Sequence, residues 1–373
     1  MPYRRVRSWA WETYWLVGGF FSWILVPWIL AFLMTSDLGR VLQEAPRRSI
    51  FWTYFFGVLW GLGGLTFGLT MRYLGMSLGM AVALGYTAAF GTLIPPIFRG
   101  QFATEVLGTR SGLTILVGVA VCLLGIVLAG AAGVSKEKEM SEEQKRAAIK
   151  EFNLKKGLLL ATFSGVMSAC FAYGLAAGDP VKELTLRHGT PTLWQGLPVL
   201  VVLLLGGFTT NFIWCAILNF RNRTSHQYFD SRIRVEIPAR SAEPILENVT
   251  DAPAEEMAAS AGKGEQAGAR APMLSNYFFS ALAGTTWYMQ FFFYTMGETQ
   301  MGRFKFSSWT LHMASIIIFS TLWGIALKEW NGTGGKTKML VVCSLIVLLG
   351  STMIVGYGNY LGTTLSAVRA LAQ

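Results

Sequence analysis

Long runs of apolar residues, separated by shorter polar segments, are the dominant pattern along this chain. Most runs are about twenty residues long, the length that an α-helix needs to cross a hydrocarbon core of about 30 Å. Lipid offers no hydrogen-bond partner to the backbone, so we expect each spanning segment to be helical. The pattern predicts about nine spans, at residues 13–34, 51–71, 75–98, 111–134, 154–178, 192–219, 273–296, 306–327 and 338–360.

Two hydrophilic segments divide this series of spans. The first, 135–153, is a charged cytoplasmic linker in which we expect a short amphipathic helix. The second, 221–270, is poor in aromatic residues and cannot bury enough apolar surface to fold alone, so we expect a mobile loop. The linker separates four spans (1–134) from five (154–373), and we interpret these two parts as repeats of a transporter in which the first repeat lacks one helix.

The composition agrees with a membrane protein. The chain is 53% hydrophobic and only 14% charged, whereas soluble domains carry about 25% charged residues. We therefore predict an all-α polytopic membrane protein that lies in a lipid bilayer. The net charge of +10 does not indicate a nucleic-acid partner, because the basic residues lie between the apolar runs. The sequence gives no indication of an oligomeric state.

Residue patterns typical of enzymes or metal sites are scarce. The chain has 3 histidines and 4 cysteines, and it contains no metalloprotease, hydrolase, phosphate-binding or paired-cysteine motif. Each cysteine falls within a different apolar run, as is typical of a small buried hydrophobic residue. We therefore expect neither an enzyme, nor a metal site, nor a cofactor.

The distribution of basic residues predicts the orientation in the membrane. When the loops are assigned alternately to two sides, the side that holds the N-terminus collects 21 of the 31 Lys and Arg residues. Cytoplasmic loops carry an excess of these residues. We therefore expect the N-terminus in the cytoplasm and the C-terminus outside.

A stripe of glycines marks the predicted span at 51–71. Gly57, Gly61, Gly64 and Gly68 recur at helical spacing, and they lie within about 60° of one another around a helix. Small residues let two helix backbones approach closely in lipid, so the stripe predicts helix packing. A sliding surface for alternating access is a second interpretation, and the two are compatible.

The predicted span at 273–296 leads into a stripe of polar-tipped residues. Trp287, Gln290, Tyr294 and Glu298 follow at helical spacing, on a face about 80° wide. An unpaired Gln or Glu facing lipid is costly, so this stripe must face protein or water. Gln290 and Tyr294 offer hydrogen bonds to hydroxyls, and Trp287 offers a flat apolar surface to a pyranose ring. The alternative is that Trp287 and Tyr294 only pack and that Glu298 lies at the membrane interface.

The predicted span at 306–327 adds Trp309 and His312, largely on one face. We expect Trp309 to be a further substrate contact. His312 either carries a proton or donates a hydrogen bond to a neighbouring helix. Glu298 and His312 are therefore the candidates for proton coupling.

Five long blocks of this sequence resemble the L-rhamnose–proton symporter family, which belongs to the drug/metabolite transporter superfamily. The blocks are WAWETYWLVGGFFSWILVPW (Trp9–Trp28), GLTMRYLGMSLGMAVALGYTAAFGTLIPPI (Gly68–Ile97), EFNLKKGL (Glu151–Leu158), WYMQFFFY (Trp287–Tyr294) and SSWTLHM with LKEWN (within Ser307–Asn331). The similarity covers most of the chain from Trp9 to Asn331, outside the 221–270 segment.

The resemblance implies ten helices in two inverted repeats of five, and uptake of a 6-deoxyhexose through the inner membrane. It also implies that protons are the coupling ion and that no other cofactor takes part. By position, the predicted spans resemble the family's second to tenth helices, so its first helix has no counterpart here. Members of the superfamily place both termini in the cytoplasm, whereas the charge distribution places this C-terminus outside, and we retain the latter expectation.

Taken with the residues, the resemblance predicts proton-coupled symport of a sugar, either L-rhamnose or a similar 6-deoxyhexose. An uncoupled facilitator or exporter of another small metabolite is the alternative. A third hypothesis is a sensor or scaffold without transport activity, in which the polar stripe would pack against another helix and leave no cavity.

Overall fold

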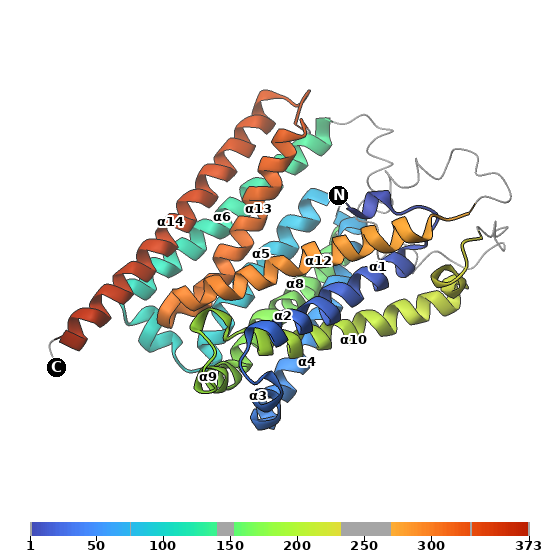
Figure 1. The fold of residues 1–373 in the computed structure, drawn as a ribbon. Helices are drawn as coiled ribbons and strands as arrows, with labels where there is room; N and C mark the ends of the chain where they lie inside the picture. The colour runs from blue at the N-terminus through green and yellow to red at the C-terminus, as the bar shows by residue number, and fades with distance from the viewer. Residues whose placement is uncertain (1, 75, 140–152, 233–269, 329, 372–373) are drawn as a thin grey trace. The chain divides into compact units, whose positions relative to one another are not determined.

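The computed structural model describes residues 2–74, 76–139, 153–232, 270–328 and 330–371. In these ranges the regular structure is helical, and the strand-like pairing is limited to an isolated bridge between Arg232 and Arg270 (Figure 1). The prediction of an all-α protein is confirmed. Most of the 221–270 segment and most of the 135–153 linker lie outside the described residues.

The α-helices follow the predicted spans closely. In chain order they are α1 (Trp11–Gly19), α2 (Val26–Met34), α3 (Leu38–Glu44), α4 (Arg47–Leu74), α5 (Met76–Phe98), α6 (Arg110–Glu139), α8 (Leu154–Ala177), α9 (Asp179–Arg187), α10 (Leu197–Arg221), α12 (Met273–Glu298), α13 (Ser308–Ala326) and α14 (Gly335–Leu371). The shorter segments are η1 (Pro2–Arg5), η2 (Phe20–Leu25), η3 (Phe102–Leu107), η4 (Thr192–Trp194), η5 (Thr224–Tyr228) and η6 (Thr299–Ser307). Of these, η2 and η3 are π-helical and the others are 3-10 helices.

Within the described residues, 8 helical segments are long and apolar enough to cross a membrane. They are Trp11–Met34, Arg47–Leu74, Leu78–Phe98, Arg110–Glu139, Leu154–Arg187, Thr192–Arg221, Phe304–Ala326 and Gly335–Gly362. The span expected at 273–296 is present as α12, but it is not among these eight. Polar residues such as Asn276, Thr285 and Gln290 lower the hydropathy of α12, which is the same feature that marked it as a functional helix.

The helices form two compact units, and each unit combines two separate parts of the chain. Unit 1 contains Met1–Gly68 and Ala177–Met296, and unit 2 contains Leu69–Ala176 and Gly297–Gln373. The chain passes between the units within α4, at the junction of α8 and α9, and near the end of α12. The predicted repeats, 1–134 and 154–373, concern internal symmetry and stay a prediction.

Unit 1 is held together by close packing between helix backbones. A methyl group added at Gly57 of α4 would overlap the carbonyl oxygen of Leu203, and one added at Gly206 of α10 would overlap that of Tyr54. These overlaps mean that the two backbones touch, which only glycine permits at these positions. Gly61 likewise lies against α10, next to Thr210.

Gly64 of the predicted stripe differs from these two glycines. A methyl group added at Gly64 would have no neighbouring atom within 4 Å among the described residues, so α4 is not closely packed there. Gly68 is the last residue of unit 1 in this helix. Within the stripe, Gly57 and Gly61 therefore make the close approach to α10, whereas Gly64 does not.

In unit 2, α6 and α14 lie side by side along much of their length (Figure 1). Gly118 and Gly125 of α6 face Val355 and Leu348 of α14, where a methyl group would contact those side chains.

All four cysteines are free thiols, and Cys343 is the one that is half-exposed.

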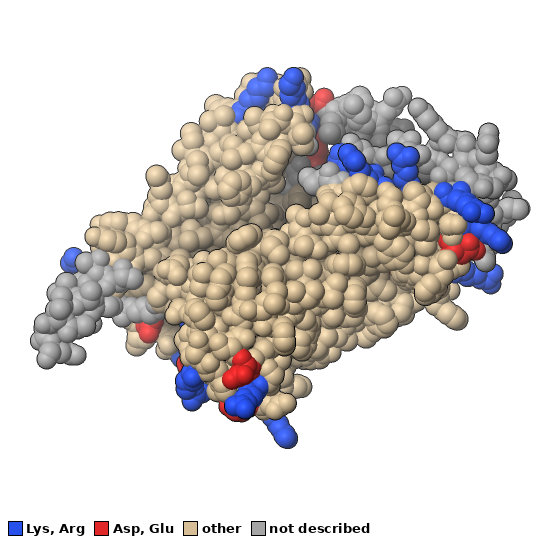
Figure 2. Space-filling model, in the orientation of Figure 1, with Lys and Arg blue, Asp and Glu red and all other residues tan. Residues whose placement is uncertain are grey.

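The surface agrees with a membrane environment. Figure 2 shows charged side chains near the ends of helices on the face in view, with uncharged surface between them. Many large apolar side chains are exposed, including Phe32, Phe163, Phe319 and Met353. Exposed apolar surface of this extent is expected where lipid, rather than water, surrounds the protein.

Candidate functional site

A cluster of aromatic rings occupies unit 1, and we call it the aromatic cluster. Its members are Trp15 of α1, Trp23 of η2, Trp60 of α4, Phe208 of α10, and Trp287 and Phe291 of α12. Five helical segments therefore meet at these six side chains. One of the six, Trp287, is a predicted substrate contact.

Two indole rings form the centre of the aromatic cluster. Trp60 and Trp287 are stacked, with ring centroids 5.8 Å apart and an interplanar angle of 29°. Phe291 presents its edge to both rings, at centroid distances of 5.7 and 4.9 Å. A methyl group at Gly207 would overlap the Trp60 ring, so this glycine makes the room in which Trp60 lies. Both indoles are half-exposed, which leaves part of their apolar surface open to a ligand.

Trp23 contributes a hydrogen-bond donor to the aromatic cluster. Its ring lies perpendicular to Trp287, at 90° and a centroid distance of 5.7 Å. The side chain is only 3% exposed, and its indole Nε1 has no hydrogen-bond partner among the described residues. A buried donor without a partner costs about 1–3 kcal/mol. A hydroxyl oxygen of a bound ligand would remove that cost.

The backbone around Trp23 is unusual as well. Residues Phe20–Leu25 form a π-helical turn between α1 and α2, within a single candidate span, Trp11–Met34. π-Helical turns are rare and occur frequently at functional sites, because the extra residue re-aims the side chains that follow it. Here the π-helical turn includes the residue whose indole N–H has no described partner.

Gln290 and Tyr294 follow Trp287 on α12 by one and two helical turns. Residues at this spacing share a helix face, and both side chains are half-buried. The structure gives Gln290 no hydrogen bond within the described part of the chain, so its amide is available to a ligand. The stripe predicted on α12 is therefore continuous with the aromatic cluster through Trp287.

Glu298 is the last residue of α12, and it belongs to unit 2. It is buried rather than exposed at a helix end. The units divide the predicted stripe between Tyr294 and Glu298, so Trp287, Gln290 and Tyr294 belong to one unit and Glu298 to the other.

Trp309 is buried in unit 2, and His312 is half-buried beside it. Trp309 is 3% exposed, its Nε1 donates to the carbonyl oxygen of Thr87 at 2.9 Å, and its ring stacks on Phe171 with centroids 5.6 Å apart. The His312 ring lies 5.5 Å from the Trp309 ring. Trp309 thus packs α13 against α5 and α8, and its polar atom is already bonded. This geometry does not favour Trp309 as a substrate contact, and that role stays a prediction.

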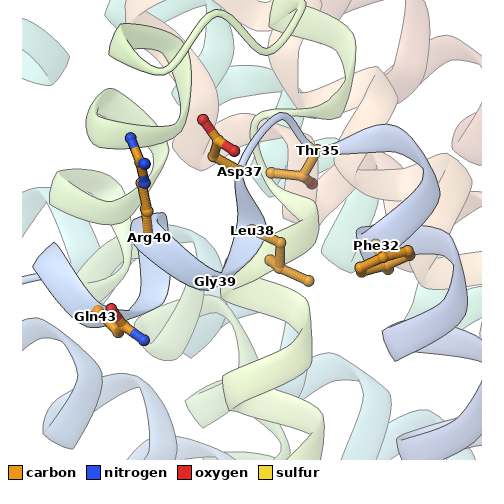
Figure 3. A pocket seen from close by; sticks show the side chains of 7 residues that line it. All are labelled: Phe32, Thr35, Asp37, Leu38, Gly39, Arg40 and Gln43. Atoms are coloured by element: carbon orange, nitrogen blue, oxygen red, sulfur yellow. The ribbon is translucent and has the colours of Figure 1, made fainter.

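A separate pocket of about 490 Å³ lies between the end of α2 and the short helix α3 of unit 1 (Figure 3). It is lined by Phe32, Thr35, Asp37, Leu38, Gly39, Arg40 and Gln43. None of these residues belongs to the predicted site. Five of the seven are exposed, and Figure 3 shows Phe32 and Arg40 at opposite ends of the lining. An open surface of this kind does not enclose a ligand.

Two tryptophans of the aromatic cluster that contact Trp287, namely Trp60 and Trp23, were not predicted from the sequence. Trp60 lies on the helix of the glycine stripe, where its spacing also suits a lipid-facing residue. Trp23 lies in a mainly apolar run that contains no charged or amide side chain to set one face apart.

Within the described residues, no group of three or more His, Cys, Asp or Glu side chains is placed to hold a metal ion.

A sequence model of the family described as L-rhamnose-proton symport protein (RhaT) matches residues 1–229 and 256–360. The L-rhamnose-proton symporter of Yersinia pestis (strain Pestoides F) is 33% identical over 358 residues, which cover 96% of this chain and 92% of the relative. The protein of the same name from Mannheimia succiniciproducens is 34% identical over 359 residues, with the same coverage of both chains.

The family match extends across both compact units, and it includes the segments that carry the aromatic cluster. A match of this length, together with relatives that align almost from end to end, settles the assignment: this chain is a multi-pass membrane transporter that belongs to the L-rhamnose-proton symport protein family.

Proposed function

We propose that this chain carries L-rhamnose, or a similar 6-deoxyhexose, together with a proton across the cytoplasmic membrane. The family and the printed names of the relatives support this function. At the level of residues, the function rests on the half-exposed Trp60–Trp287 pair. Trp23 lies against this pair, and its indole N–H has no hydrogen-bond partner among the described residues. No cofactor other than the proton is needed.

The chemistry of a 6-deoxyhexose suits the aromatic cluster. Such a sugar has an apolar face of C–H groups and a methyl group, and its hydroxyls lie around the edge of the ring. Indole rings provide a flat apolar surface for the face. The N–H of Trp23 and the amide of Gln290 provide hydrogen bonds for the edge, and Tyr294 offers a further hydroxyl. We propose that Trp287, Gln290 and Tyr294 bind the sugar, with Trp60 and Trp23 as additional contacts.

Proton coupling requires a titratable group whose protonation favours the same conformations as sugar binding. The residues proposed from the sequence are Glu298 and His312. Glu298 is buried at the end of α12 and His312 is half-buried on α13, and both belong to unit 2. Replacing both while acid-driven uptake stays intact would remove them from the proposal.

We also propose that the N-terminus lies in the cytoplasm and the C-terminus outside. The excess of Lys and Arg on the N-terminal side supports this orientation. Fusing a reporter that is active only in the cytoplasm to each terminus would test it. The expected result is activity at the N-terminus and none at the C-terminus.

The experiment that tests the function is uptake of radiolabelled L-rhamnose by cells that lack their own carrier. We expect uptake that an uncoupler abolishes. Uptake that is insensitive to the uncoupler would support the alternative, a facilitator. No uptake by protein that is well inserted in the membrane would overturn L-rhamnose as the substrate and lead to a panel of other sugars and metabolites.

A further inference from the structure

Glu12 is a carboxylate enclosed within unit 1. It lies in the first turn of α1 and is 4% exposed. Its Oε1 accepts hydrogen bonds from Nδ2 of Asn222 at 3.2 Å and from Oγ1 of Thr224 at 2.7 Å. Both donors are neutral. Among the described residues, no Lys, Arg or His nitrogen lies within ion-pair distance of Glu12.

The titratable groups that face Glu12 come from α10 and η5. They are the thiol of Cys215 and the hydroxyl of Tyr228. Burial raises the pKa of Tyr228 to about 12, so this hydroxyl keeps its proton at neutral pH. Arg221 and Arg223, at the end of α10 and the start of η5, are exposed to solvent.

The remaining titratable group of η5 is His226, and it is engaged elsewhere. Its Nδ1 is bonded to the carbonyl oxygen of Arg223 at 2.9 Å. Glu12 is therefore the group of this cluster that is both acidic and enclosed.

Two oxygen acceptors, one on Glu12 and one on Asn219, compete for the single proton of the Thr224 hydroxyl. Thr224 Oγ1 lies 2.7 Å from Oε1 of Glu12 and 2.9 Å from Oδ1 of Asn219, but a hydroxyl has a single proton to donate. The amide nitrogen of Asn219 faces the Tyr228 hydroxyl, to which it donates at 2.9 Å, so the amide presents its oxygen rather than its nitrogen to Thr224. A proton on Glu12 removes the shortage: Glu12 then donates to Thr224, and Thr224 donates to Asn219.

Loss of that proton requires a different arrangement. A charged Glu12 attracts the Thr224 proton, and the amide of Asn219 must then turn so that its nitrogen, rather than its oxygen, faces Thr224. Asn219 and Tyr228 would exchange donor and acceptor roles. The two protonation states of Glu12 are therefore linked to two hydrogen-bond arrangements between α10 and η5.

Helix α1 and segment η5 are joined by further bonds. Oε1 of Gln227 accepts from the backbone N–H of Ala10 at 2.7 Å and from Oγ1 of Thr13 at 3.0 Å. The Tyr277 hydroxyl of α12 donates to the carbonyl oxygen of Tyr228 at 2.7 Å. A change in how η5 is bonded therefore reaches the N-terminal end of α1 directly.

The same span carries the sugar contact proposed above. Trp23 follows Glu12 by eleven residues, which is about 16 Å along a helix. We propose that Glu12 is a proton-carrying carboxylate of the symport cycle and that α1 with η2 connects its protonation to sugar binding at Trp23. This inference rests on the proposed function, and it adds a titratable group in unit 1 to the two proposed in unit 2.

The test uses the full-length protein in proteoliposomes and the variant Glu12→Gln. Glutamine supplies the donor to Thr224 but cannot release it as a proton. Two quantities are measured: exchange of labelled for unlabelled L-rhamnose without a gradient, and accumulation driven by a pH gradient. One proton per sugar and a gradient of one pH unit give an accumulation ratio of up to about tenfold.

We expect Glu12→Gln to retain exchange and to lose accumulation, so that the ratio falls to about one. Glu12→Asp should restore part of the accumulation. The matched control is Glu183→Gln, an exposed carboxylate on α9 of the same unit, which should accumulate sugar like the wild type. Wild-type accumulation by Glu12→Gln would overturn the inference.

A second variant covers the case in which Glu12→Gln does not insert. Thr224→Val removes the shared hydroxyl and leaves the carboxylate, so the pH dependence of exchange should shift, and an unchanged pH profile would overturn the role of Glu12. The wild type separates this inference from the proposed function. No exchange of L-rhamnose by the wild type would overturn both, whereas exchange by the wild type with accumulation by Glu12→Gln would overturn only the role of Glu12.

Discussion

The indole of Trp60 lies against the indole of Trp287 with an interplanar angle of 29°, although 227 positions of the sequence separate α4 from this part of α12. The pair exists because Gly207 of α10 leaves room for the Trp60 ring. Three helices of unit 1 thus combine to present a flat apolar surface. That relationship gives the first prediction.

Replacing Trp287 with Ala should raise the KM for L-rhamnose about tenfold or more, because the variant loses the stacking surface. A tenfold change corresponds to about 1.4 kcal/mol, close to the lower end of the range of about 1.5–3 kcal/mol for burial of a large apolar side chain. Initial uptake rates over a range of sugar concentrations measure this effect. The control is Trp194→Phe, since Trp194 stacks on Phe292 outside the aromatic cluster. Equal KM values for Trp287→Ala and the wild type would remove Trp287 from the site.

Replacing Trp23 with Phe should weaken sugar binding about two- to tenfold. The change keeps a ring and removes the N–H, and one hydrogen bond contributes about 0.5–1.5 kcal/mol. Trp9→Phe is a matched control, because Trp9 is also buried with an Nε1 that has no described partner, but it packs on Tyr277 away from the aromatic cluster. Binding can be followed by tryptophan fluorescence in detergent. A loss of affinity in both variants alike would point to a general packing effect instead.

Replacing Gly57 with Ala should destabilise unit 1 by about 1–3 kcal/mol, the usual cost of overpacking. The added methyl group would overlap the backbone of α10 at Leu203, and a backbone cannot move aside as a flexible side chain can. Gly64→Ala tests the same substitution on the same helix where no described atom lies within 4 Å, and it should be tolerated. The midpoint of thermal aggregation in detergent distinguishes the two variants.

Replacing Trp309 with Phe should lower stability while KM stays within about twofold of the wild-type value. The variant loses the hydrogen bond to Thr87, but it keeps a ring against Phe171. Loss of one buried hydrogen bond that leaves its acceptor unpaired costs about 1–3 kcal/mol. Thermal stability and uptake kinetics are measured on the same preparation. A large rise in KM without a loss of stability would instead support Trp309 as a substrate contact.

The length of the apolar runs was sufficient to predict the membrane-spanning helices, because lipid imposes both their length and their internal hydrogen bonding. The polar stripe on α12 was also visible, since Gln290 stands out in an apolar run. The pattern of apolar and polar residues within each helix does not show which helices are neighbours. The meeting of Trp60, Trp23 and Trp287 depends on contacts between α4, η2 and α12, and the enclosure of Glu12 depends on η5, which follows α1 by about two hundred residues.

The division of the chain into interleaved units also has a consequence for biosynthesis. Residues Met1–Gly68 belong with Ala177–Met296, so the first helices to leave the ribosome lack their later partners in unit 1, such as α10 and α12, until more than a hundred further residues have been made. The whole of unit 2's first segment is inserted in the meantime, and its remaining partners, Gly297–Gln373, come last. Helices such as α1 and α4 must therefore remain in the bilayer without these later partners, which their apolar length allows. Unit 1 can reach its full set of contacts only after α12 has been synthesised, and unit 2 only after Gly297–Gln373 has followed.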